Sequence, residues 1–168
     1  MITRLAKVFF AFAFIVTVSS CDRKSCTNVV CPAGQACNNG QCFCPDGYEG
    51  TDCQTLSYQK YVGLFGNVSE SCNPNAPFLT NTFNITWNGS YNNQIQINGL
   101  MGNNCYNIIA IIRTDNNNMG NILEIPQQNC GASTISGQGT YDAVNRRVNL
   151  QLYYNDGFSS YQCNTTLY

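Results

Sequence analysis

A dense run of cysteines near the N-terminus is the feature that most limits how this chain can fold. The segment from Cys21 to Cys53 holds seven of the eleven cysteines in the sequence. So short a segment cannot bury enough apolar surface to fold alone, so cross-links must restrict its unfolded state. The chain has no histidine. Zinc therefore lacks one of its usual ligands, and disulfides formed in an oxidising compartment are favoured over a metal site.

The first 20 residues have the pattern of a secretory signal. Residues 1–7 carry two positive charges, residues 8–18 form an apolar run interrupted only by Thr17, and two serines precede Cys21. The apolar run is too short for a membrane-spanning helix, which needs about 20 residues. The sequence therefore predicts an exported protein.

The segment Val18 to Cys21 resembles the lipobox of bacterial lipoproteins, in which an aliphatic residue and two small residues precede a cysteine. The resemblance implies a lipoprotein signal peptide over 1–20, acyl chains on Cys21, and a lipid-anchored linker over 21–25. Ten cysteines then remain, an even number for disulfides. We expect a cell-envelope protein, at the outer membrane, whose contact with the membrane is the anchor. The alternative is a secreted protein with a free thiol at Cys21.

The six cysteines of residues 26–53 resemble those of an EGF-like module. A single residue separates Cys42 from Cys44, and the closing segment reads Cys-Pro-Asp-Gly-Tyr-Glu-Gly-Thr-Asp-Cys. Counting alone leaves many connectivities open. Residues 22–25 and 38–41 lack the pattern of calcium-binding members, so we expect no calcium and a stalk rather than a partner-binding role. The resemblance implies the pairs Cys26–Cys37, Cys31–Cys42 and Cys44–Cys53.

Residues 58–168 alternate between short apolar-patterned segments and turn sequences, with no convincing helix. This pattern is typical of antiparallel sheets. The chain is therefore predicted to be all-β, with a small disulfide-rich EGF-like module followed by an antiparallel β-barrel or sandwich of about eight strands. Consecutive hairpins favour a meander, and closure would pair the first strand with the last. The expected strands are 61–71, 79–87, 94–98, 106–113, 121–126, 134–141, 148–154 and 158–167.

Four cysteines lie in this larger domain, and three pairings of them are possible. In a closed meander the end of the first strand lies near the start of the last, and the start of the fourth lies near the end of the fifth. This topology favours Cys72–Cys163 and Cys105–Cys130. The domain resembles the cysteine-stapled β domains of Bacteroidetes-type lipoproteins, which are lipocalin-like in strand count. That resemblance places no functional residue.

Composition argues against several classes of function. Without histidine, imidazole-based catalysis is excluded. Loss of Arg4 and Lys7 with the signal leaves six basic against nine acidic residues, so we expect no nucleic-acid partner. The turn at 115–120 departs from calcium-loop spacing. Three of the five acids in the larger domain, Glu70, Asp115, Glu124, Asp142 and Asp156, sit in or beside turns. We therefore expect no enzyme, no cofactor and no metal.

Aromatic side chains are the best candidates for a binding surface, although strand alternation should turn about half of them inward. The leading hypothesis is a non-enzymatic envelope lipoprotein whose β domain binds a protein or glycan. A different hypothesis is a lipocalin-like carrier of a small apolar ligand. A third is a hydrolase that uses carboxylates such as Glu70 and Glu124. The candidate surface residues are Trp87, Tyr153, Tyr154, Phe158 and Tyr161.

Overall fold

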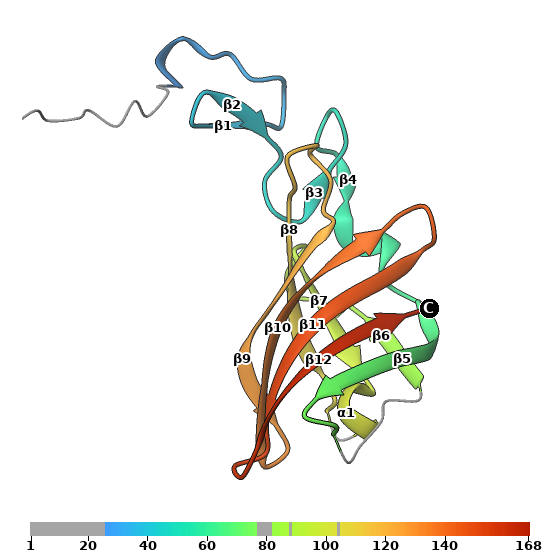
Figure 1. Cartoon of the computed structure of the whole chain (residues 1–168). Coiled ribbons are helices and arrows are strands. Elements are labelled where there is room, and N and C mark those ends of the chain that lie inside the picture. The colour runs from blue at the N-terminus through green and yellow to red at the C-terminus, as the bar shows by residue number, and fades with distance from the viewer. Residues whose placement is uncertain (1–25, 77–81, 88, 104) are drawn as a thin grey trace, which may run out of the picture.

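The structure, a computed structural model, describes residues 26–76, 82–87, 89–103 and 105–168 (Figure 1). The expected signal peptide, Cys21 and the linker 21–25 lie outside these residues. Within the described ranges, no helix combines the length and apolar character needed to cross a membrane.

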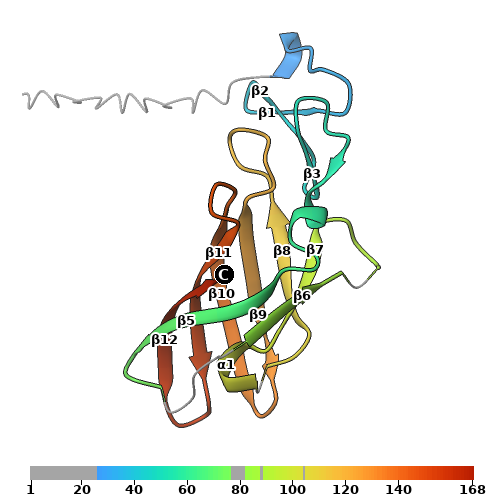
Figure 2. The same ribbon diagram turned by 90° about the vertical axis from the view of Figure 1, so that its right-hand side faces the viewer.

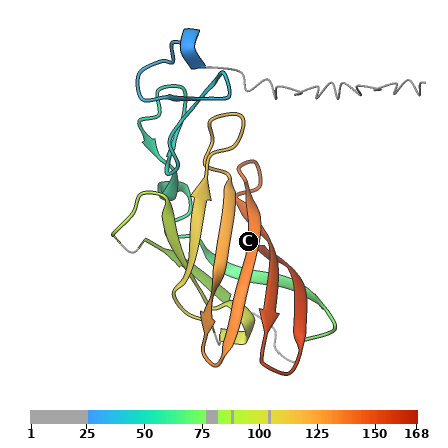
Figure 3. The ribbon, with the colours of Figure 1, turned by 90° about the vertical axis from the view of Figure 1, so that its left-hand side faces the viewer.

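Eight antiparallel strands close into one barrel, in agreement with the all-β prediction. They run as a meander in which each strand pairs with the next, and β12 pairs with β5 to close the sheet. Figure 3 shows the later strands, coloured orange to red, lying side by side as one wall. The strands are β5 (Phe65–Asn73), β6 (Thr82–Thr86), β7 (Gln94–Asn98), β8 (Ile108–Arg113), β9 (Ile122–Cys130), β10 (Ser133–Asp142), β11 (Arg147–Asn155) and β12 (Ser160–Leu167).

Strand alternation fills the inside of this barrel. In β11, Val148, Leu150 and Leu152 are buried, whereas the residues between them face outward. Isoleucines from β6, β7, β8, β9 and β10 meet them in one core. A barrel of about eight strands has an interior just wide enough for side chains. The inward-facing side chains of the described strands thus meet in one core inside the barrel.

Both ends of the barrel are closed by buried side chains. At one end, the turn α1 (Leu100–Asn103) places Leu100 and Met101 fully inside. At the other, residues just before the expected first strand form a 3-10 helix, η2 (Ser57–Lys60), and the following Tyr61 is fully buried. The Tyr61 hydroxyl donates a hydrogen bond to the Gly120 carbonyl over 2.7 Å. This bond fixes the orientation of the ring, which covers this end of the core.

The N-terminal residues form a small module with little regular structure. Its elements are η1 (Cys26–Asn28), β1 (Ala36–Asn38), β2 (Gln41–Phe43), β3 (Tyr48–Glu49) and β4 (Thr55–Leu56). The disulfides here are the three pairs implied by the EGF-like resemblance. The barrel contains the two pairs expected from the meander, Cys72–Cys163 and Cys105–Cys130.

The module docks directly on the η2 end of the barrel (Figures 1 and 2). Asp46 accepts hydrogen bonds from the Arg113 guanidinium at 2.7 Å and from the Thr114 backbone N–H at 3.1 Å. Gly47 lies against the backbone of Asn92, with φ 91°, so a side chain at this position would collide with the barrel. The module and the barrel are therefore held together by specific contacts.

Candidate ligand-binding face

Two of the five proposed surface aromatics are not on the surface, so that part of the prediction is wrong. Tyr154 is 6% exposed and Tyr161 is 9% exposed, and both rings belong to the core. The reason is strand parity, because each occupies the inward-facing half of its strand. Their hydroxyls reach partners at the barrel rim, where Tyr154 contacts Ser133 at 3.0 Å and Tyr161 contacts Asp156 at 3.3 Å.

The remaining three aromatics are exposed but do not form one surface. Trp87 stacks on Tyr58 at a centroid distance of 4.5 Å, at the module end. Phe158 is 99% exposed in the β11–β12 turn, at the end of the barrel opposite to the module. Tyr153 points outward from β11 near this turn. A single aromatic binding patch is therefore not present among these residues.

Instead, the outer wall of β10, β11 and β12 carries two parallel rows of uncharged polar side chains. The register aligns Gln138, Gln151 and Asn164 in the first row and Thr140, Asn149 and Thr166 in the second. The rows are two positions apart along each strand, which corresponds to about 7 Å. We call these six residues the amide–hydroxyl face.

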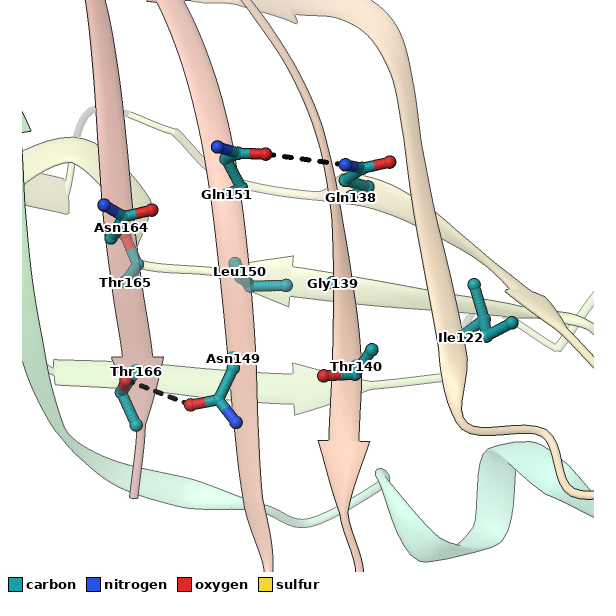
Figure 4. A pocket seen from close by; sticks show the side chains of 10 residues that line it. All are labelled: Ile122, Gln138, Gly139, Thr140, Asn149, Leu150, Gln151, Asn164, Thr165 and Thr166. Atoms are coloured by element: carbon teal, nitrogen blue, oxygen red, sulfur yellow. Dashed lines mark hydrogen bonds between the residues drawn. The ribbon is translucent and has the colours of Figure 1, made fainter. Parts of the chain in front are cut away.

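A shallow hollow of about 600 Å³ lies on this face (Figure 4). Gln138 donates to Gln151 over 3.4 Å in the first row, and Thr166 donates to Asn149 over 3.1 Å in the second. The residues between the rows are Gly139, Leu150 and Thr165. Since Leu150 and Thr165 are buried, the floor between the rows is mostly backbone.

Gly139 lies where β10 has no room for a side chain against β11. A Cβ built on Gly139 would lie only 2.5 Å from the Leu150 side chain and 2.4 Å from the Asn149 carbonyl oxygen. Without a side chain at this position, Leu150 packs across β10, as Figure 4 shows. The glycine therefore allows β10 and β11 to pack closely between the two polar rows.

A second hollow, of about 510 Å³, continues the outer wall toward the β11–β12 turn. Ser136, Tyr153 and Gln162 line it in cross-strand register, and Asn73 of β5 follows. Among the described residues, none that lines either hollow is charged. The combined surface presents amides, hydroxyls, the exposed Tyr153 ring and the exposed side chain of Ile122, with many hydrogen-bond donors and acceptors.

The two glutamates proposed as a carboxylate pair lie on opposite sides of the barrel wall. Glu70 occupies an inward position of β5 and accepts a hydrogen bond from Thr165 at 2.9 Å. Glu124 points outward from β9 and forms an ion pair with Arg113 at 2.8 Å. These two carboxylates cannot flank one scissile bond.

Glu70 also lies beside the Cys72–Cys163 disulfide, with its carboxylate and both sulfurs within 4.8 Å of one another. Metal binding by cysteine requires thiolates. Because these sulfurs are oxidised to a disulfide, this grouping is not a thiolate metal site.

Other acids serve as caps of turns. Asp115 accepts hydrogen bonds from the backbone N–H groups of Asn117 and Met119. Hydrogen bonds from the side chain and backbone of Asn145 lower the pKa of Asp142 below its usual value. The Ser159 and Phe158 N–H groups do the same for the pKa of Asp156. Their backbone partners make them structural turn residues.

Comparison with protein-family models, curated proteins and solved structures finds no match to this chain. A small, disulfide-rich, all-β protein with a closed barrel is what the structure itself establishes. In the sequence, the polar residues at positions 149, 151, 164 and 166 occupy alternate positions of two expected strands. Only the register shows that these polar side chains lie next to one another on neighbouring strands.

Proposed function

We propose that this protein is a lipid-anchored, non-enzymatic cell-envelope protein whose barrel binds a neutral glycan on the amide–hydroxyl face. The observation that carries the proposal is the double row of uncharged donors and acceptors around an open hollow. Sugar hydroxyls both donate and accept hydrogen bonds, as amide and hydroxyl side chains do. The uncharged lining favours a neutral glycan over an anionic one.

Protein binding is the nearest rival for this face. Protein interfaces usually place buried aromatic or arginine anchors at their centre. Here the two rows are amides and hydroxyls, the exposed apolar side chain Ile122 lies at the edge of the hollow, and the exposed Phe158 lies outside both hollows. This composition supports a glycan as the ligand.

A carrier role and a hydrolase role receive less support. A carrier would hold its ligand inside the barrel, whereas Leu100, Met101 and Tyr61 close its ends over a filled core. A hydrolase built on Glu70 and Glu124 would need both carboxylates on one side of the wall. The outer hollows therefore support a binding role better than an interior one.

The small module is proposed to hold the barrel away from the membrane. The described chain begins with η1, the blue segment in Figure 2, which lies in the part of the module remote from the barrel. An anchor at Cys21 would thus place the module between the membrane and the barrel. The contacts of Asp46 and Gly47 with the barrel support a stiff spacer.

Binding is tested by applying the folded, oxidised protein to an array of neutral and acidic oligosaccharides. We expect retention on neutral glycans. The double variant Gln138→Ala/Gln151→Ala should bind about thirtyfold more weakly, since each of the two lost hydrogen bonds is worth roughly 1 kcal/mol. Gln96→Ala, an outward amide on β7, is the matched control and should bind normally. Binding that is equal in all three proteins, or absent from every neutral glycan, would overturn the proposal.

Anchoring is tested on the mature protein purified from membranes of a bacterial host. We expect its N-terminal peptide to begin at Cys21 and to carry acyl mass, because two or more chains give stable anchoring where one does not. Substitution Cys21→Ser should release the protein from the membrane fraction. An unmodified Cys21 thiol would contradict the lipid anchor.

A further inference from the structure

A lysine, an asparagine and a glutamate from three different segments meet where the module joins the barrel. The Lys60 ammonium donates hydrogen bonds to Glu49 Oε2 at 2.6 Å and to Asn121 Oδ1 at 2.7 Å. Glu49 belongs to β3 of the module, Lys60 to η2, and Asn121 immediately precedes β9. Lys60 therefore bridges a carboxylate and a carboxamide that come from opposite sides of the junction.

This cluster is largely shielded from water. The side chains of Lys60 and Glu49 are 16% and 10% exposed. The rings of Tyr61 and Tyr141 flank the Lys60 nitrogen, with centroids at 5.6 Å and 5.3 Å. Burial and the nearby Glu49 carboxylate raise the pKa of Tyr61, so this neighbour stays neutral. The amine and the amide are thus held in a small aromatic-walled compartment.

The asparagine and the glutamate are both held in place by other bonds. Asn121 Nδ2 donates to Asp115 Oδ2 at 3.1 Å, which turns Oδ1 toward Lys60. The Gly120 N–H donates to Glu49 Oε2 at 3.0 Å. These hydrogen bonds therefore restrain Glu49 and Asn121 beside the Lys60 amine.

We propose that Lys60 and Asn121 join through an intramolecular isopeptide bond, with Glu49 moving the protons. Glu49 takes a proton from Lys60, and the neutral Nζ attacks Cγ of Asn121. The Nζ–Cγ bond forms and the Cγ–Nδ2 bond breaks as Glu49 gives this proton to the departing nitrogen and takes the second proton from Nζ. The products are a lysine–aspartyl amide and one molecule of ammonia, which takes the second proton from Glu49 and leaves as ammonium. No oxidant, reductant or further reactant is needed.

Two physical factors favour this reaction. The 2.6 Å hydrogen bond between the Lys60 ammonium and Glu49 gives the proton a direct path from nucleophile to carboxylate. Fixed proximity converts a slow bimolecular aminolysis into a unimolecular step, and effective molarities of well-oriented groups reach about 10⁵ M or more. The new bond would tie the segment after the module to the strand that begins at Ile122.

Peptide mapping of the mature protein tests the bond directly. After reduction and alkylation, trypsin should cut an unlinked chain at Lys60 and Arg113 into the peptides 25–60, 61–113 and 114–146. The proposal predicts instead that Lys60 is not cleaved and that peptide 25–113 is joined to 114–146. The intact chain should be lighter by one ammonia beyond the mass expected for its five disulfides.

Two conservative variants separate this bond from other losses of ammonia. Lys60→Arg keeps a cation but has no amine nucleophile, and Glu49→Gln keeps a hydrogen-bonding shape without the proton carrier. Both should have the full mass and separate peptides. Separate peptides from the unmodified sequence would overturn the proposal, and so would an ammonia loss that persists in Lys60→Arg, which indicates cyclisation at an Asn–Gly bond. A link that persists in Glu49→Gln would overturn the role of Glu49.

Discussion

At the scale of single residues, the Gln128 side chain supplies hydrogen bonds between β8 and β9 where the backbone pairing ends. The β8–β9 ladder pairs only Ile111 to Arg113 with Ile122 to Glu124, and Pro126 has no N–H to continue it. Beyond that point the Gln128 side chain takes over. It accepts a bond from the Ile109 N–H at 2.8 Å and donates one to the Ile109 carbonyl at 2.9 Å. One amide thus replaces a pair of backbone bonds.

Replacing Gln128 with alanine should therefore destabilise the protein by about 1–2 kcal/mol, because the Ile109 backbone groups lose both partners. Urea unfolding monitored by tryptophan fluorescence measures the change. The neighbouring Gln127→Ala is the matched control, since Gln127 is exposed, and should alter stability by less than about 0.5 kcal/mol. Equal effects of the two variants would refute the role given to Gln128.

Asp156 gives a prediction about acid. Backbone N–H bonds from Ser159 and Phe158 lower its pKa in the folded state, so folding favours the ionised carboxylate. Its contribution is present above the unfolded pKa of about 3.9 and is lost as pH falls through the lower folded value. An NMR titration should show Asp156 ionising below its usual range, and Asp156→Asn should remove this step. A midpoint at or above the usual value would contradict the turn geometry.

At the scale of elements, β5 is held in the barrel mainly from one side. It pairs with β12 over six positions, from Val68 to Asn73, but with β6 over only three, from Phe65 to Asn67. The Cys72–Cys163 disulfide lies within the longer ladder. The disulfide and the ladder with β12 therefore together hold β5 in place at the seam, the β5–β12 pairing that closes the barrel.

The double variant Cys72→Ser/Cys163→Ser should lose about 4–5 kcal/mol, since this bond closes a loop of 91 residues. Removing Cys105–Cys130, which spans 25 residues, should cost less, about 3 kcal/mol. Hydrogen exchange should show β5 losing protection first in the Cys72/Cys163 variant alone. Uniform loss of protection across the barrel would argue against a local seam.

Strand alternation in the sequence anticipated most of the elements but not their ends. The segment Gln94–Asn98 was expected as a strand and forms β7 with the same limits. Residues 61–64 were expected as strand, yet β5 begins at Phe65. Tyr61 instead packs into the end of the barrel, where its hydroxyl bonds to Gly120. β9 runs past Pro126 to Cys130, which local propensity disfavours and the disulfide and Gln128 support. Tertiary contacts decided each difference.

At the scale of the whole molecule, the module and barrel are one connected structure. The contacts join residues far apart in sequence, such as Asp46 with Arg113 and Glu49 with Gly120. Cysteine spacing predicted the disulfide-rich module, and alternation predicted an antiparallel barrel or sandwich. Neither pattern contains information about pairs of this kind, so the sequence suggested only a short junction. The same limit applied to the amide–hydroxyl face, which depends on three aligned strands.

The most direct test of the central claim, that this face binds a neutral glycan, is an NMR titration of the oxidised protein with a neutral oligosaccharide retained on the array. We expect the side-chain amide signals of Gln138, Gln151 and Asn164 to shift in a saturable way. The signal of Gln96, on the opposite wall of the barrel, should stay in place. Saturable shifts confined to the module or to β7, with the three amides unmoved, would contradict the account.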